Sequence, residues 1–270
     1  MTVLWPIAFI TFKEGIRNRA IYGISLFALM LLGANMLVSN MMMRSAGKAA
    51  VDMALSTISI SGLLLVLFVG INLIAKDLDK RTIYMVLARP LSRYQYILGK
   101  FFGMALLIIV AVVFLSIFAC LSILLVKAVS PQNFERFSWT PVSLAVILTT
   151  LMLLLLSALS FLFASFTSSS FITLSLTIIT YIIGQSLSDV KALVETPESI
   201  GITVSPVTET AVKWAYYVFP NLSLFDIKLQ AAHGIEISSA YLFWVVVYGI
   251  VYTSLALALA ALIFRQKEFP

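Results

Sequence analysis

The sequence predicts an all-α membrane protein with six transmembrane helices, on the basis of its composition, its uncharged segments and its charge distribution. Of the 270 residues, 61% are hydrophobic and only 11% are charged, and the mean hydropathy is +1.05. A soluble domain averages roughly 45–50% apolar and about 25% charged residues. A soluble fold of this size could not bury so much apolar surface, so a lipid bilayer is the expected solvent.

Five segments lack Asp, Glu, Lys, Arg and His, and a transmembrane helix needs about 20 mainly apolar residues. They are residues 20–43, 54–75, 101–126, 137–188 and 237–264. The longest has room for two helices, separated at the polar stretch SFTSSSF at 165–171. Six spans are therefore expected within a single domain, 1–270, at 20–40, 54–75, 97–126, 142–164, 170–188 and 240–264.

Two further segments are expected at the membrane surface. Residues 5–17 predict an amphipathic interfacial helix, with charged residues mostly on the other side. Its apolar residues recur at helical spacing, at Trp5, Phe9, Phe12 and Ile16. The outer segment 189–236 contains TETAVKWAYYVFPNL (208–222), which predicts one or two short helices entering the outer leaflet, with Trp214 at headgroup level. A solvated loop is the alternative for this segment.

The basic residues are unevenly distributed over the predicted loops. With the N-terminus in the cytoplasm, eleven of the 18 Lys and Arg residues lie on the cytoplasmic side and seven outside. The cytoplasmic ones are Lys13, Arg17, Arg19, Lys76, Lys80, Arg81, Arg89, Arg93, Lys100, Arg265 and Lys267. This bias follows the positive-inside rule, so both termini are expected in the cytoplasm. The net charge of +6 then requires no nucleic-acid partner.

The stretch between the second and third spans concentrates charge. DKRTIYMVLARPLSRYQYILGK, residues 79–100, holds five of the 18 Lys and Arg residues. Asp79 can cap a short helix. Apolar residues recur on one face of that helix, at Ile83, Val86, Leu87 and Leu91. Because Pro90 disfavours helix at the residue before it, a break is expected there.

A new helix is expected to start just after this break. Ser92 and Gln95 form a capping-box pattern. From there the helix would run to about Val126, which is ~51 Å at 1.5 Å per residue. Because the hydrocarbon core is only about 30 Å thick, the base of this helix should project into the cytoplasm. The G-x-x-x-G pattern at 99–103 lies in that base, and the sequence assigns it no role.

Residues 76–103, KDLDKRTIYMVLARPLSRYQYILGKFFG, resemble the cytoplasmic loop of bacterial type-2 ATP-binding-cassette (ABC-2) export permeases. In that family an acidic residue, Gly-Thr, Leu-x-x-Pro-x-x-Arg and Leu-Gly-Lys follow in order. The matching residues are Thr82, Leu87, Pro90, Arg93, Leu98, Gly99 and Lys100. Asp77 or Asp79 replaces the usual Glu, and Arg81 the frequent Gly.

Two other stretches carry the resemblance further along the chain. FKEGIRNRAIYGI (12–24) is similar to the family's elbow helix. YYVFPNLSLFDI (216–227) resembles the outer segment of permeases encoded with copper-enzyme maturation genes, including those linked to nitrous oxide reductase.

The resemblance implies a permease dimer in the bacterial inner membrane that works with two cytoplasmic ATPases. Segment 77–93 would be the coupling helix that docks in an ATPase groove. The residues assigned to this contact are Asp79, Lys80, Arg81, Thr82, Ile83, Val86, Leu87, Arg89, Pro90 and Arg93. A positive-inside topology signal without a partner is the alternative, but it does not account for the Pro90 break or the long third helix.

The absence of certain sequence motifs argues against several classes of function. No G-x-x-x-x-G-K-[ST] motif is present, so ATP and Mg²⁺ would bind to the partner ATPase and this chain is not expected to be an enzyme or to hold a cofactor or metal. No ionisable residue is expected at hydrocarbon depth, which argues against a proton-coupled carrier. A membrane scaffold for an ATPase-linked maturation complex is the second reading, and a secondary carrier or channel is the third.

Hydroxyl and amide side chains mark a candidate substrate path along the second and fifth spans. The candidates are Thr57, Ser61, Asn72, Thr177 and Thr180. The same residue types also form hydrogen bonds and close packing between membrane helices, so both interpretations stay open. The sequence does not identify the substrate.

Overall fold

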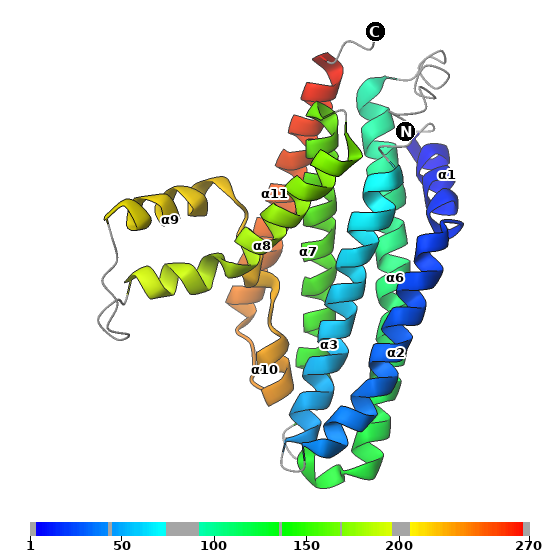
Figure 1. Ribbon diagram of the computed structural model, residues 1–270, viewed down its shortest axis with the longest axis vertical. Coiled ribbons are helices and arrows are strands. Elements are labelled where there is room, and N and C mark those ends of the chain that lie inside the picture. Colours follow the sequence, from blue (N-terminus) through cyan, green and yellow to red (C-terminus); the bar gives the residue numbers. More distant parts are fainter. Residues whose placement is uncertain are drawn as a thin grey trace.

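The computed structural model describes residues 4–42, 45–73, 92–134, 137–167, 169–195 and 206–266, and the regular secondary structure in them is helical. Six long helices form the body of the molecule (Figure 1). They are α2 (Arg19–Met41), α3 (Ala46–Leu64, continued by the π-helical turn η1, Leu65–Gly70), α6 (Arg93–Val129), α7 (Trp139–Phe166), α8 (Ser170–Glu195) and α11 (Ser239–Gln266). Each is long and apolar enough to cross a membrane, which confirms the all-α, six-span fold class.

The short elements connect or flank these spans. They are α1 (Leu4–Ile16), η2 (Pro131–Phe134), α9 (Pro206–Val218), η4 (Ser223–Phe225) and α10 (Lys228–His233). In Figure 1, α9 and the end of α8 extend sideways from the bundle, and α10 returns to it. There α10 packs against α3 and α7.

The second long helix begins earlier than the uncharged run from residue 54 suggested. It starts at Ala46, and the backbone hydrogen bond from Ala49 to Ser45 closes its first turn at 3.0 Å. Lys48 and Asp52 therefore lie on a helix, because polar side chains are compatible with helix wherever they can reach water. Apolar runs show the part of a helix that suits lipid and not where the helix ends.

The core lies between α3, α6 and α7. Of the six spans, α3 and α7 are the most buried. Fully buried side chains from these helices interlock, among them Leu55, Ile58, Met104, Leu107, Leu153 and Leu156. The large side chains on the outward faces of α2, α8 and α11 remain exposed, as expected of helices that face lipid.

Candidate coupling site and substrate path

Four helix ends meet at the end of the bundle where α1 begins, which we call the termini end. The ring of Tyr96, at the start of α6, stacks on Phe264, near the end of α11, with centroids 5.9 Å apart. The span that begins with α3 and η1 is described up to Leu73, whose carbonyl contacts Lys100 of α6. The expected coupling residues Asp79 to Pro90 lie outside the described residues, and the described chain on either side of them, up to Leu73 and from Ser92, lies at this end. Arg93 is the first residue of α6.

Lys100 joins the two flanks of this segment. Its side chain is only 5% exposed, and its Nζ donates a hydrogen bond to the carbonyl oxygen of Leu73 at 2.5 Å. The ammonium also lies 5.5 Å from the centre of the Tyr96 ring, a cation–π distance. This buried cation therefore ties the span that begins with α3, at Leu73, to the base of α6.

The start of α6 is set by local hydrogen bonding. The Ser92 N–H donates to Gln95 Oε1 at 3.3 Å, which is the reciprocal bond of a capping box. The helix then runs from Arg93 to Val129 without interruption. Its length agrees with the expectation of a long third helix with an extended base.

α1 packs on α6 at the G-x-x-x-G pattern in the base of α6. A Cβ on Gly99 would lie 2.8 Å from Ile7 Cβ, and one on Gly103 would lie 2.5 Å from the carbonyl oxygen of Ala8. Further along, a Cβ on Gly15 of α1 would lie 2.6 Å from Leu107 of α6. In these pairs the residue number rises along both helices, so α1 runs parallel to α6. Small residues allow this close approach, as they do between membrane helices generally.

The outer face of α1 is apolar and exposed. Trp5 and Phe9 are exposed, whereas Thr11 is buried against α6. Phe12 packs against the core, so only part of the predicted apolar stripe faces outward. This surface suits a membrane interface, and that location stays a prediction.

The end of α3 departs from regular helix geometry. Residues Leu65–Gly70 form a π-helical turn, and such turns recur at functional sites. Gly70 lies within this turn, where a Cβ would be 3.0 Å from Met104 Cε of α6. The irregular turn ends at Gly70, and residues 71–73 return to α-helix before the coupling segment.

The five candidate path residues do not line one common cavity in the single chain. Thr57 and Thr177 are buried, and each hydroxyl donates to its own helix, to the carbonyls of Met53 and Thr173. Thr180 is buried as well. These contacts are typical of hydroxyls packed between helices.

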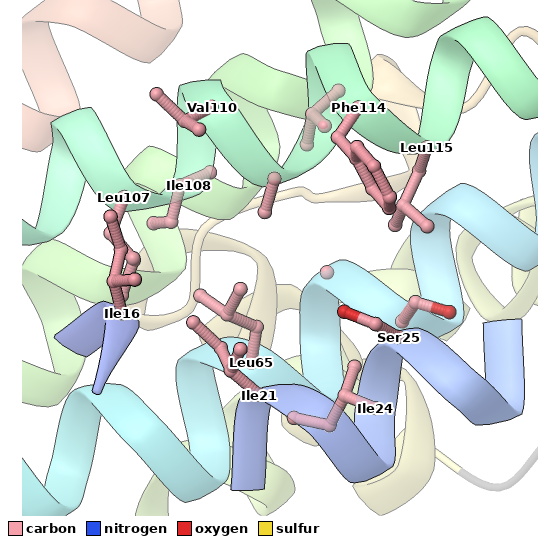
Figure 2. Close-up of a pocket in the computed structure, with 14 residues that line it drawn as sticks. Ile16, Ile21, Ile24, Ser25, Leu65, Leu107, Ile108, Val110, Phe114 and Leu115 are labelled. Atoms are coloured by element: carbon pink, nitrogen blue, oxygen red, sulfur yellow. The ribbon is translucent and has the colours of Figure 1, made fainter. Parts of the chain in front are cut away.

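The other two candidates lie in separate cavities. An apolar cavity of about 220 Å³ lies between α2, α3 and α6 (Figure 2). Ser61 is among its lining residues, and within the described part of the chain its buried Oγ has no hydrogen-bond partner. Asn72 is exposed, and it lines a polar cavity of about 620 Å³ at the termini end together with Lys13 and Arg17.

A buried polar cluster that the sequence analysis did not single out joins α2, α3 and α6 at the opposite end. Asn35 is fully buried, and its Nδ2 donates to the Ala50 carbonyl at 2.9 Å and to Ser122 Oγ at 3.0 Å. Ser39 Oγ donates to Asn35 Oδ1 at 2.9 Å. An amide within an otherwise apolar span is costly unless it is bonded, and this cost is the signal that could have identified Asn35.

A second polar cluster holds the outer segment in the bundle. The backbone N–H of Leu222 donates to the Gly184 carbonyl at 3.0 Å, and that of Asn221 to Tyr248 Oη at 2.9 Å. Leu222 and Phe225 are completely buried. Residues 220–227 therefore pack inside the protein, between α8 and α11, which the sequence alone did not predict.

Comparison with known families agrees with this architecture. A family profile described as "ABC-2 family transporter protein" matches residues 5–269. A comparison with curated proteins gave no match. Because the family match covers nearly all of the chain, the protein belongs to the ABC-2 family of transporter proteins.

Proposed function

We propose that this chain is the permease subunit of an ABC exporter, and that residues 79–93 couple it to a separate cytoplasmic ATPase. The observation that carries the proposal is the family match over residues 5–269, because an ABC-2 membrane subunit works with an ATP-binding cassette partner. The absence of a P-loop from the sequence supports the same division of labour. ATP and Mg²⁺ would bind to the ATPase, and this chain would supply the path across the membrane.

The contacts around Lys100 suggest how a movement of the coupling segment would reach the spans. The segment is attached to α3 on one side and to α6 on the other. Since Lys100 joins these two helix ends, and Gly99 and Gly103 seat α1 on the same part of α6, a displacement there would move three helices together. The π-helical turn before Leu73 gives α3 a place to adjust.

The apolar face of the coupling segment would enter the ATPase groove, and its basic residues would surround that contact. Ile83, Val86 and Leu87 supply the apolar face, and Arg81 and Arg89 lie at the rim. A homodimer of this permease in a bacterial inner membrane, with both termini cytoplasmic, completes the proposal. The candidate path residues Thr57, Ser61, Asn72, Thr177 and Thr180 would be reached by the substrate only in that assembly.

The test is reconstitution with candidate ABC ATPases from the same genome. Each ATPase and the permease are purified together, placed in liposomes, and assayed for ATP hydrolysis with and without the permease. We expect a stable complex whose hydrolysis rate depends on the permease and changes across a panel of candidate substrates. If an ATPase binds but its hydrolysis never responds to any substrate, the chain is a scaffold, and failure of every candidate ATPase to bind would contradict the proposal.

A further inference from the structure

Two cavities follow one another along the seam between α3 and the junction of α1 with α2. The apolar cavity is lined by Ile16, Ile21 and Ile24 on one side and by Leu65 of α3 and several residues of α6 on the other (Figure 2). The polar cavity is lined by residues of the same junction and by the end of α3. Its residues are Ile10, Lys13, Glu14, Arg17, Asn18, Asn72 and Leu73. Ile16 lines the apolar cavity and Arg17 the polar one, so the two linings are consecutive along the chain at this junction.

The chemistry of the pair matches the two parts of a phospholipid. Among the described residues, the lining of the polar cavity has two cationic groups, on Lys13 and Arg17, and one carboxylate, on Glu14, so its formal charge favours an anion. Basic pockets between membrane helices are known to bind lipid phosphates. The neighbouring cavity presents mainly hydrocarbon, from Ile21, Leu65 and Leu107. Its volume of about 220 Å³ exceeds the ~150 Å³ at which an engineered apolar cavity already binds benzene.

The distance between the two cavities and the exposure of the apolar one also suit a phospholipid. From Leu65 in the apolar cavity to Asn72 in the polar one, α3 advances by roughly 10 Å at 1.5 Å per residue. Headgroup regions add about 5–8 Å to each side of the hydrocarbon core, so one cavity falls at headgroup depth when the other lies among acyl chains. Val110 and Phe114 line the apolar cavity and are 44% and 42% exposed, so it has an opening on the lipid-facing surface.

We propose that this seam binds one anionic phospholipid, with its phosphate between Lys13 and Arg17 and an acyl chain between α2, α3 and α6. None of the residues of this site is assigned to the ATPase contact, and binding can be measured on the permease alone. A lipid here would contact the start of the π-helical turn at Leu65 and the helix just after the turn at Asn72.

Ser61 gives the proposal a sharp consequence. Ser61 lines the apolar cavity, and its Oγ is already buried and has no hydrogen-bond partner among the described residues. An acyl chain offers no acceptor to this hydroxyl and removes no water from it. Ser61→Ala should therefore leave phospholipid binding unchanged. A ligand that accepted a hydrogen bond from Ser61 would be weakened by the same change.

The experiment is a titration of the purified permease with phosphatidylglycerol, followed by native mass spectrometry. We expect one tightly retained lipid in the wild type. The double variant Lys13→Gln/Arg17→Gln should lower the affinity by roughly thirtyfold, and Ala111→Leu, which fills the apolar cavity, should lower it as well. Arg19→Gln and Val113→Leu are matched controls, because neither residue lines a cavity that we describe, and both should bind as the wild type does.

Three outcomes would overturn the proposal. Equal retention in all variants would mean that only unspecific boundary lipid is present. Competition by inorganic phosphate without any effect of Ala111→Leu would mean that the site binds free phosphate. Weaker binding in Ser61→Ala would mean that the apolar cavity recognises a hydrogen-bond acceptor and not an acyl chain.

Discussion

Two buried polar side chains, Lys100 and Asn35, fix how the helices meet at opposite ends of this apolar bundle. Lys100 joins α3 to α6 at the termini end, and Asn35 joins α2, α3 and α6 at the other end. In a membrane the hydrophobic effect does not drive helices together, so bonds of this kind and close packing determine their arrangement. Each can be removed by a single substitution.

Replacing Lys100 with Met should loosen the end of α3 while preserving most of the apolar side chain. The Leu73 carbonyl would lose a charged donor, and such hydrogen bonds contribute about 1.5–3 kcal/mol. We expect a lower midpoint of thermal unfolding and reduced ATPase stimulation in the complex. Lys48→Met is the control, because Lys48 is exposed and lies at the start of α3, far from Leu73. Equal loss in both variants would contradict a specific role for Lys100.

Replacing Asn35 with Leu should destabilise the bundle. The change removes both donor bonds and leaves Ser39 without its acceptor. Interhelical hydrogen bonds in membranes contribute about 0.6 kcal/mol on average and at most about 1.7, so a loss of roughly 1–2 kcal/mol is expected. Unfolding in mixed detergent micelles measures it. Ser116→Ala, whose hydroxyl bonds only to its own helix at Val112, should change stability little; if it costs as much as Asn35→Leu, the interhelical bonds are not the cause.

At the scale of elements, the docking of α1 on α6 depends on glycine. Gly103→Leu would force its side chain against the Ala8 carbonyl and Thr11, so α1 should detach. Hydrogen–deuterium exchange of residues 4–16 should then rise, because the helix loses its packing partner. Gly33→Leu is the control, since nothing lies within 4 Å of a Cβ at that position. Unchanged protection of α1 in Gly103→Leu would show that the packing of α1 on α6 does not need this glycine.

The sequence predicted elements better than it predicted their partners. Long apolar runs identify six spans because a bilayer demands them, and Ser92 with Gln95 correctly placed the start of α6. The pattern at 99–103 was visible, but nothing in the sequence shows which helix a small residue faces. The segment 220–227 was equally ambiguous, because Leu222 and Phe225 suit a protein interior as well as lipid. The periodicity of apolar residues predicts which face of a helix is buried, but it does not predict which helix or loop packs against that face.

At the scale of the whole molecule, the uneven distribution of Lys and Arg predicts the orientation. In a Cys120→Ala background, Gln132→Cys in η2 should react with an impermeant maleimide in intact cells. Gln266→Cys, at the end of α11, should react only after permeabilisation, because eleven of the 18 basic residues are assigned to that side. Both positions are exposed, so accessibility is not limited by burial. Labelling of Gln266→Cys in intact cells would reverse the assigned topology.

The central claim concerns residues 79–93. The contacts of Lys100 and the packing of α1 on α6 take part in coupling only if an ATPase binds that segment and moves it. If the segment served topology alone, its charge would matter and its shape would not. Pro90→Ala preserves every charge but removes the predicted break. Ile83→Asp places a carboxylate on the predicted apolar face, where burial without a partner is costly. Arg81→Ala and Arg89→Ala should cost less, about 1 kcal/mol, as rim charges do.

The most direct measurement is co-purification of the ATPase with each variant, together with the ATP hydrolysis of the reconstituted complex. Membrane insertion of every variant is checked first, so that a misfolded permease is not counted as uncoupled. The account predicts that Pro90→Ala and Ile83→Asp insert normally but lose ATPase binding or stimulated hydrolysis. If both variants bind the ATPase and stimulate its turnover as fully as the wild type, residues 79–93 do not couple this permease to ATP hydrolysis.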